Sequence, residues 1–337
     1  MKSHVSCQPA GYHCLMETCS GERCFRLEDV LGSDYTQQRL DMANNEFATL
    51  VSLPANPGVP PRGAMLYLHG FVDYFFQDHV ARHFAEQDWA WYAVDLRRYG
   101  RSLRPNQEPW YTDDLTEYYE ELDLSIDRIR ADGHERIVLM GHSTGGLIGS
   151  IWAHDRRKSH PIDGLILNSP WLDLQGSTFD RTVGTWLLRG VAKVRPLMNV
   201  PRKLSDIYPQ SIHSCARGEW NFNPQWKPLT RQPVKAGFFA AVRKQHARLH
   251  RGLDVGVSVL MLRSDRSRLD LDSWHDDAHV TDIVLDVEHM ERWLPKVGRD
   301  VTDIPLPGAK HDVMLSASPV RERAMAEIDT WLAEKLS

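Results

Sequence analysis

The hydrophobic positions of the chain follow two alternating patterns. Short runs of apolar and β-branched residues, typical of buried strands, recur from residue 47 onward, and longer segments between them repeat apolar residues at helical spacing. Strands are expected at 47–53, 64–70, 90–96, 136–142, 164–170, 257–263 and 301–307. Helices are expected at 78–87, 114–131, 145–157, 235–251, 287–297 and 318–335. This alternation predicts an α/β fold with a mostly parallel sheet flanked by helices.

Two stretches interrupt the alternation. The sequence LPANPGVPPRG at 53–63 predicts a turn, because proline and glycine are disfavoured inside paired strands, and we expect the core of the sheet to begin after it. Residues 172–234 contain six prolines and three tryptophans, and an insertion of this length in an α/β domain is usually a lid or a binding loop. The expected organisation is therefore a leader at 1–29, a core in two parts at 30–171 and 235–337, and an inserted cap between these parts.

Composition and charge exclude several classes of protein. The 337 residues are 42% hydrophobic, and 40 Lys and Arg against 45 Asp and Glu give a formal net charge of −5 with no basic stripe or tail. Nucleic-acid binding is therefore not expected. No apolar run approaches the roughly 18 residues of a membrane span, and the N-terminus lacks the continuous apolar segment of a signal peptide. We expect a soluble, cytoplasmic protein.

The cysteines gather near the N-terminus. Cys7, Cys14, Cys19 and Cys24 lie in the leader, and Cys215 is distant from them. Their spacing does not match the paired C-x-x-C pattern of a zinc site, so we interpret the segment as a flexible leader and expect no metal. A metal or redox role for these cysteines is the alternative.

The stretch LMGHSTGG places one hydroxyl between glycines. Ser143 lies in a G-x-S-x-G pattern, directly after the strand expected at 136–142 and before the helix expected at 145–157. This context is typical of a nucleophile elbow, a sharp strand-to-helix turn that exposes a serine. A phosphate-binding loop would need G-x-x-x-x-G-K-[ST], and a dinucleotide fingerprint would need G-x-G-x-x-G; neither is present here. We therefore predict that Ser143 is a nucleophile.

A serine nucleophile needs a base, and in this strand order the base follows the nucleophile along the chain. His311, in PLPGAKHDVMLS, lies on a glycine-containing loop between the last expected strand and the last helix, and it is the predicted base. His289 is the nearest rival, but it falls inside an expected helix.

The acid that orients the base is less defined. Asp282 is our first choice, because the 29 residues from it to His311 fit one helix, one strand and two short loops. Asp265 closely follows the strand expected at 257–263 and is the alternative acid, and Asp286 is a third. For each of these three aspartates, the alternative interpretation is an ordinary solvent-exposed carboxylate with no catalytic role.

An acyl-transfer site also needs donors for the developing oxyanion. The backbone amide of Thr144, which begins the helix after the nucleophile, is one candidate, and the amide of Phe71, in LHGF after an upstream strand, is the other. Tyr74, His142 and Trp171 are the candidate substrate-binding residues. Aromatic residues also dominate protein cores, so the alternative for Tyr74 and Trp171 is a position in the core. The alternative for His142 is a packing role beside the serine.

Taken together, LHGF at 68–71, VDLRRYGRS at 94–102, GHSTGG at 141–146, DIVLDV at 282–287 and GAKHDV at 308–313 resemble the α/β-hydrolase superfamily. The closer resemblance is to its lysophospholipase and monoacylglycerol-lipase-like serine hydrolases. This resemblance implies eight strands, a cap after the sixth strand, and hydrolysis of esters or thioesters without a metal or cofactor. It also implies structural roles for Asp95 and Arg97, in a loop that carries Arg98 where glycine is common.

These features favour a carboxylic ester hydrolase with a Ser-His-Asp triad that acts on a small-molecule ester, in which an apolar acyl group is expected. An acyltransferase that uses the same acyl-enzyme is the alternative, and a non-catalytic ligand-binding protein on this fold is the third interpretation. The sequence leaves the natural substrate and the oligomeric state open.

Overall fold

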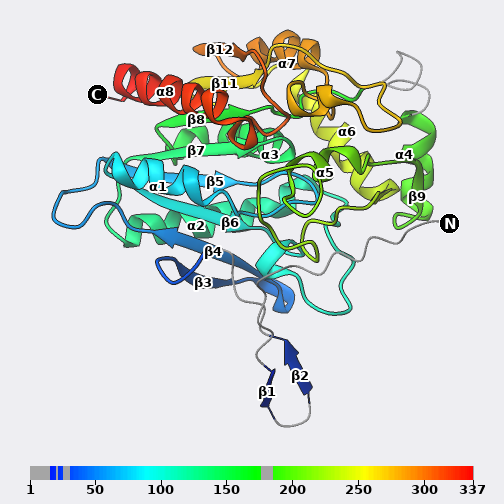
Figure 1. Cartoon of the computed structure of the whole chain (residues 1–337), viewed down its shortest axis with the longest axis horizontal. Coiled ribbons are helices and arrows are strands. Elements are labelled where there is room, and N and C mark those ends of the chain that lie inside the picture. Colours follow the sequence, from blue (N-terminus) through cyan, green and yellow to red (C-terminus); the bar gives the residue numbers. More distant parts are fainter. Residues whose placement is uncertain (1–15, 20–21, 26–30, 176–184, 337) are drawn as a thin grey trace.

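The computed structural model describes residues 16–19, 22–25, 31–175 and 185–336. Within these ranges eight strands form one twisted sheet with the order β12-β11-β8-β7-β5-β6-β4-β3 (Figure 1). The strands are β3 (Thr36–Asp41), β4 (Phe47–Leu53), β5 (Gly63–Leu68), β6 (Trp89–Asp95), β7 (Ile137–His142), β8 (Gly164–Asn168), β11 (Ser258–Ser264) and β12 (Val301–Leu306). The pairs β3/β4 and β4/β6 are antiparallel, and the other pairs are parallel. The fold is therefore α/β with a mostly parallel sheet, as predicted.

Helices cover both faces of this sheet. The helices are α1 (Asp78–Glu86), α2 (Tyr119–Ala131), α3 (Thr144–Arg156), α4 (Thr185–Val194), α5 (Ile207–Ile212), α6 (Ala236–Leu249), α7 (Val287–Trp293) and α8 (Ser318–Lys335). Buried residues of α1 and α8 pack on one face, whereas those of α2, α3 and α6 pack on the other (Figure 1). Within the described ranges, no helix combines the length and the apolar character needed to cross a membrane.

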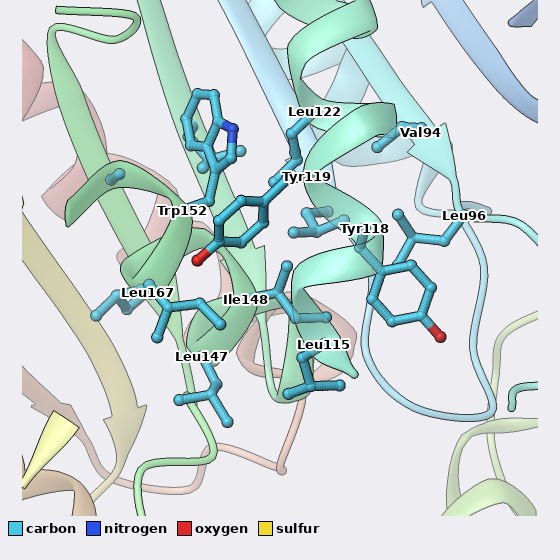
Figure 2. Packing of buried hydrophobic residues seen from close by; sticks show 14 of the residues in the cluster. Val94, Leu96, Leu115, Tyr118, Tyr119, Leu122, Leu147, Ile148, Trp152 and Leu167 are labelled. Carbon is cyan, nitrogen blue, oxygen red and sulfur yellow. The ribbon is translucent and has the colours of Figure 1, made fainter. Parts of the chain in front are cut away.

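The core explains why the expected strands were readable from the sequence. Every residue of β5, β6 and β7 is buried, so these strands are nearly continuous apolar runs. Figure 2 shows one face, where Trp152 and Ile148 of α3 pack with Tyr119 and Leu122 of α2. Each fully buried aliphatic side chain of this kind stabilises the fold by about 1.5–3 kcal/mol.

One strand lacks such a signal, and it corrects the expected start of the sheet. Strand β3 has the sequence TQQRLD and buries only Leu40, because it is an edge strand paired on one side. Together with β4 it places two sheet strands before the proline-rich turn at 53–63. The expectation that the sheet core begins after that turn is therefore wrong, since an exposed edge strand needs no alternation of apolar residues.

The loop after β6 contains the residues to which the resemblance assigned structural roles. Asp95 is fully buried, and its carboxylate accepts hydrogen bonds from the amides of Phe75 and Arg101. Arg97 is buried and donates to the Glu121 carboxylate at 2.6 Å. Arg98 has a φ of 67°, the left-handed conformation that explains why glycine is common at this position.

The segment between β8 and α6 contributes a small structure of its own. It contains α4, β9 (Asn199–Lys203), α5 and β10 (Pro233–Lys235), and β9 pairs with β10 in an antiparallel ribbon. It follows the sixth strand of the main sheet, the place where the resemblance puts a cap. In the N-terminal region the strands β1 (Met16–Cys19) and β2 (Glu22–Phe25) form a hairpin, and Cys7 and Cys14 lie outside the described residues.

Candidate active site

Ser143 lies on a sharp turn between β7 and α3. Its backbone has φ 53° and ψ −116°, a left-handed conformation that is strained for a residue with a side chain. The helix starts at the next residue, Thr144. A strand that runs into a helix through one strained serine is the geometry of a nucleophile elbow.

The glycines of this turn are required by close approach of the backbone. A Cβ atom added to Gly145 would lie 2.4 Å from the carbonyl oxygens of both Leu68 and His69, which belong to the end of β5. A Cβ atom on Gly141 would lie 2.7 Å from the Gly145 carbonyl oxygen. Helix α3 can therefore approach the sheet this closely only because both positions lack side chains.

Gly145→Ala is expected to destabilise the protein by about 1–3 kcal/mol, since the new methyl group overlaps backbone atoms that cannot rotate away. Urea unfolding followed by circular dichroism measures this change. Gly190→Ala is the matched control: Gly190 lies in α4 with no heavy atom within 4 Å of an added Cβ, so stability is expected to hold or rise slightly. Equal stability of the two variants would contradict this account of the turn.

A hydrogen-bonded chain connects Ser143 to a histidine and a carboxylate. His311 Nε2 lies 3.1 Å from Ser143 Oγ, and His311 Nδ1 lies 2.8 Å from Asp282 Oδ2. All three residues are buried. Because a carboxylate can only accept, His311 carries its proton on Nδ1, which leaves Nε2 to accept the hydroxyl proton of Ser143.

Asp282 is held by backbone amides. Its Oδ1 atom accepts hydrogen bonds from Val284 and Leu285, each at 2.8 Å, and the side chain is inaccessible to solvent. The other two candidate acids lie elsewhere: Asp265 is exposed, and Asp286 caps α7 by accepting from the Glu288 amide. Of the three candidates, only Asp282 reaches His311.

The loop that carries His311 is fixed by its neighbour Asp312. This buried carboxylate accepts from Asn168 at 2.7 Å and from Gln77 at 2.9 Å. Asn168, at the end of β8, also accepts from the Val313 amide. The loop that carries His311 is therefore tied to the carboxyl end of β8.

The predicted oxyanion donors lie on either side of the serine. Thr144 is the first residue of α3, where the backbone amides are free of intrahelical acceptors. On the other side, a Cβ atom added to Gly70 would lie 3.1 Å from Ser143 Cβ, which places the loop after β5 against the serine. Phe71, the next residue, stacks on Phe238 with ring centroids 4.1 Å apart.

A cavity of about 360 Å³ opens at these residues. Its wall includes Ser143, His311 and both candidate donors. The rest of the wall is largely apolar and comes from the segment after β8, from α6 and from the region before α7: Trp171, Leu174, Val200, Leu204, Val234, Phe239, Leu269, Leu271, Ile283, Val284 and Leu285.

Two of the three candidate substrate-binding residues line the cavity, and the third lies in the hydrophobic core. Trp171 and His142 line the cavity, whereas Tyr74 does not. Tyr74 is fully buried among apolar residues, and its hydroxyl accepts from the Asn223 amide at 2.7 Å. Tyr74 therefore belongs to the core, as does Phe222, and the partly buried Trp226 packs its ring against Tyr74.

His142 lies beside the base, with ring centroids of His142 and His311 4.9 Å apart. Complete burial lowers the pKa of His142, so this imidazole is neutral near pH 7. A neutral ring next to His311 avoids placing a second positive charge where the imidazolium of His311 would form.

Sequence reasoning missed a buried ion pair in the cavity wall. Asp73 Oδ1 and Lys227 Nζ lie 2.5 Å apart, and their side chains are 2% and 7% exposed. The available signal was an acidic residue inside the aromatic stretch FVDYFFQ, next to the expected oxyanion loop. Its partner lies 154 residues away, at a distance no local pattern spans.

Comparison with known proteins places this geometry in a family. Residues 59–254, more than half of the chain, match the model of the serine aminopeptidase family S33. The chain belongs to this family. The match includes the elbow of this α/β-hydrolase and most of the segment after β8, and it ends before Asp282 and His311. No curated protein matches this chain by sequence.

Solved structures share the fold of this S33 α/β-hydrolase. A soluble variant of monoglyceride lipase from Saccharomyces cerevisiae, in complex with a substrate analog, has a TM-score of 0.68 at 18% identity, covering 91% of this chain and 98% of the lipase. The monoacylglycerol lipase of Paleococcus ferrophilus has a TM-score of 0.62 at 18% identity, covering 89% and 99%. A carboxyl esterase from Bacillus coagulans, in complex with glycerol, has a TM-score of 0.63 at 14% identity, covering 90% and 100%.

Proposed function

We propose that this protein is a carboxylic ester hydrolase that works through an acyl-enzyme. The observation that carries the proposal is the buried chain Ser143–His311–Asp282, which opens into an apolar cavity. A serine hydroxyl, an imidazole and a carboxylate in this order supply a nucleophile, a proton acceptor and an orienting anion.

The reaction has two halves. Ser143 Oγ attacks the ester carbonyl carbon while its proton passes to His311 Nε2, and the Asp282 carboxylate stabilises the resulting imidazolium. The tetrahedral intermediate then breaks its bond to the alcohol oxygen, which takes the proton from Nε2, and the acyl group stays on Ser143. In the second half water attacks the acyl carbon, gives its proton to Nε2, and the acid leaves as Oγ regains the proton.

The amides of Phe71 and Thr144 are the proposed donors to the oxyanion. Both residues flank Ser143, and the N-terminus of α3 adds the positive end of its dipole. Donors placed in advance where charge develops are usually a large part of the rate enhancement.

The cavity favours an ester with an apolar acyl group, such as a monoacylglycerol-like or lysophospholipid-like substrate. Its wall is mostly aliphatic and aromatic, and we propose that the described part of residues 172–234, which supplies much of it, forms a cap over the site. An aminopeptidase would need an acidic group for the substrate ammonium. Of the carboxylates in the described wall beyond the triad, Asp73 is paired with Lys227 and Asp272 is exposed, so we favour esters over peptides.

A series of p-nitrophenyl esters of increasing acyl length tests this function. We expect kcat/KM to rise up to about fourfold per added methylene, because each buried methylene contributes about 0.8 kcal/mol, until the cavity is filled. Aminoacyl p-nitroanilides are expected to react at least tenfold more slowly than the best ester. Faster cleavage of the anilides would overturn the ester assignment, and absence of both activities together with absence of fluorophosphonate labelling would overturn the hydrolase proposal.

A further inference from the structure

The proposed oxyanion loop contains a strained residue. Val72, between Phe71 and Asp73, has a φ of 54°, in the left-handed region that β-branched residues almost never adopt. Such a conformation is unfavourable and persists only where the surroundings impose it. Val72 joins Phe71 to Asp73, so with Asp73 held in place a rotation about the N–Cα bond of Val72 would displace the Phe71 backbone and turn its amide.

Contacts on both sides of Val72 hold the loop. On one side, the Phe71 ring stacks on Phe238 of α6, with an interplanar angle of 16°. On the other side, Asp73 forms the 2.5 Å ion pair with Lys227, which comes from the proposed cap. Both anchoring residues, Phe238 and Lys227, belong to chain segments that follow β8.

Asp73 depends on this ion pair because it has few other partners. Its second oxygen, Oδ2, is buried and has no hydrogen-bond partner in the part of the chain that the structure describes. Lys227 Nζ in turn lies between 5.6 and 5.9 Å from the ring centroids of Phe76, Tyr208 and Phe222. A buried carboxylate of this kind depends on its cation, and loss of one partner is strongly unfavourable.

We propose that Lys227 is a positioning residue for the oxyanion donor: through Asp73 it holds Val72 in its left-handed conformation and so keeps the Phe71 amide directed at the substrate carbonyl. This inference rests on the proposed function. It makes the cap part of the catalytic geometry, because without Lys227 the loop relaxes Val72 toward an extended conformation and the amide turns away.

The first test removes the ion pair without leaving a lone buried charge. The double variant Asp73→Asn/Lys227→Met is expected to lower kcat by about 10- to 100-fold with KM changed less than threefold, since an oxyanion donor acts mainly on the transition state. Affinity for an alkyl trifluoromethyl ketone, whose adduct with Ser143 carries an oxyanion, is expected to fall in parallel. Lys244→Met removes an exposed ion pair with Asp114 and is expected to leave kcat unchanged.

The second test uses the strain itself. Glycine adopts a positive φ without steric cost, so in a Val72→Gly background the loop needs less external support. Adding Asp73→Asn/Lys227→Met to Val72→Gly is then expected to lower kcat less than adding it to the parent protein. The fold-loss in the Val72→Gly background should be at least threefold smaller than the fold-loss in the background with Val72. Equal factors in the two backgrounds would overturn the role of Val72 strain, which the proposal requires.

The outcomes separate this inference from the proposed function. If the unmodified protein hydrolyses esters and labels with a fluorophosphonate, but the double variant retains its kcat and its ketone affinity, the positioning role is wrong and the hydrolase stands. A rise in KM with kcat unchanged would also overturn it, because Lys227 would then be a substrate contact. If the unmodified protein shows neither activity nor labelling, the proposed function itself fails. Far-ultraviolet circular dichroism and melting temperatures of all variants verify that they are folded.

Discussion

Ser143→Ala is expected to lower kcat/KM for p-nitrophenyl esters by about 10⁴- to 10⁶-fold, because the acyl-enzyme cannot form without the hydroxyl. The substitution removes one oxygen from a side chain that is 9% exposed and adds nothing that could clash. We therefore expect the melting temperature to change little. Steady-state hydrolysis and fluorophosphonate labelling both measure the effect.

His311→Ala is expected to cause a loss of similar size, and the double variant Ser143→Ala/His311→Ala no further loss, because residues that act as a unit are not additive. Ser159→Ala is the control, since Ser159 is exposed and bonds only to the carbonyl of Arg156 among the hydrogen bonds that the structure records for it. Ester hydrolysis by the Ser143 variant within tenfold of the parent would contradict the assignment of the nucleophile.

The second large effect is expected for Asp282→Asn, at about 10⁴-fold in kcat. The hydrogen bonds of Asp282 explain why the expected loss in kcat is large. Because Oδ1 of Asp282 accepts from two backbone amides, the amide oxygen of the substituted side chain must take that place, and its NH₂ group then faces His311 Nδ1. Nδ1 must then accept, so Nε2 carries the proton and can no longer accept one from Ser143.

Asp265→Asn is the matched comparison. Asp265 is exposed, so kcat is expected to stay within about twofold of the parent. Rate measurements across pH 6–9 on both variants decide between the two acids. Near-normal activity of Asp282→Asn with a large loss in Asp265→Asn would move the acid to Asp265.

The choice of acid illustrates what local sequence information lacked. An acid is expected just after the strand at 257–263, which is why Asp265 remained an alternative. In the structure the chain leaves β11, makes an excursion, and returns so that Asp282 forms a bridge with Ser267 and exchanges backbone hydrogen bonds with Arg266 and Arg268. Asp282 thus lies beside the end of β11 in space although it lies 18 residues after β11 ends at Ser264.

The sequence by itself determined the strands with buried runs and the helices that flank the main sheet, and it predicted the chain order of the proposed nucleophile and base; it did not indicate α4 or α5. These features depend on local periodicity and on turn chemistry, which neighbouring residues specify. Sequence patterns also predicted that Phe71 and Thr144 lie beside Ser143. Thr144 follows Ser143 directly, and Phe71 lies in the loop after β5, which pairs in parallel with β7.

Only the tertiary structure decided which aromatic residues face the cavity and which charges meet in its wall. Tyr74 and Trp171 look alike as aromatic residues near the predicted site, yet one is core and the other is wall. The pairing of Asp73 with Lys227 and the strain at Val72 depend on how the segment after β8 packs against the loop after β5. Such contacts arise from packing between distant segments, and no spacing or periodicity in the sequence encodes them locally.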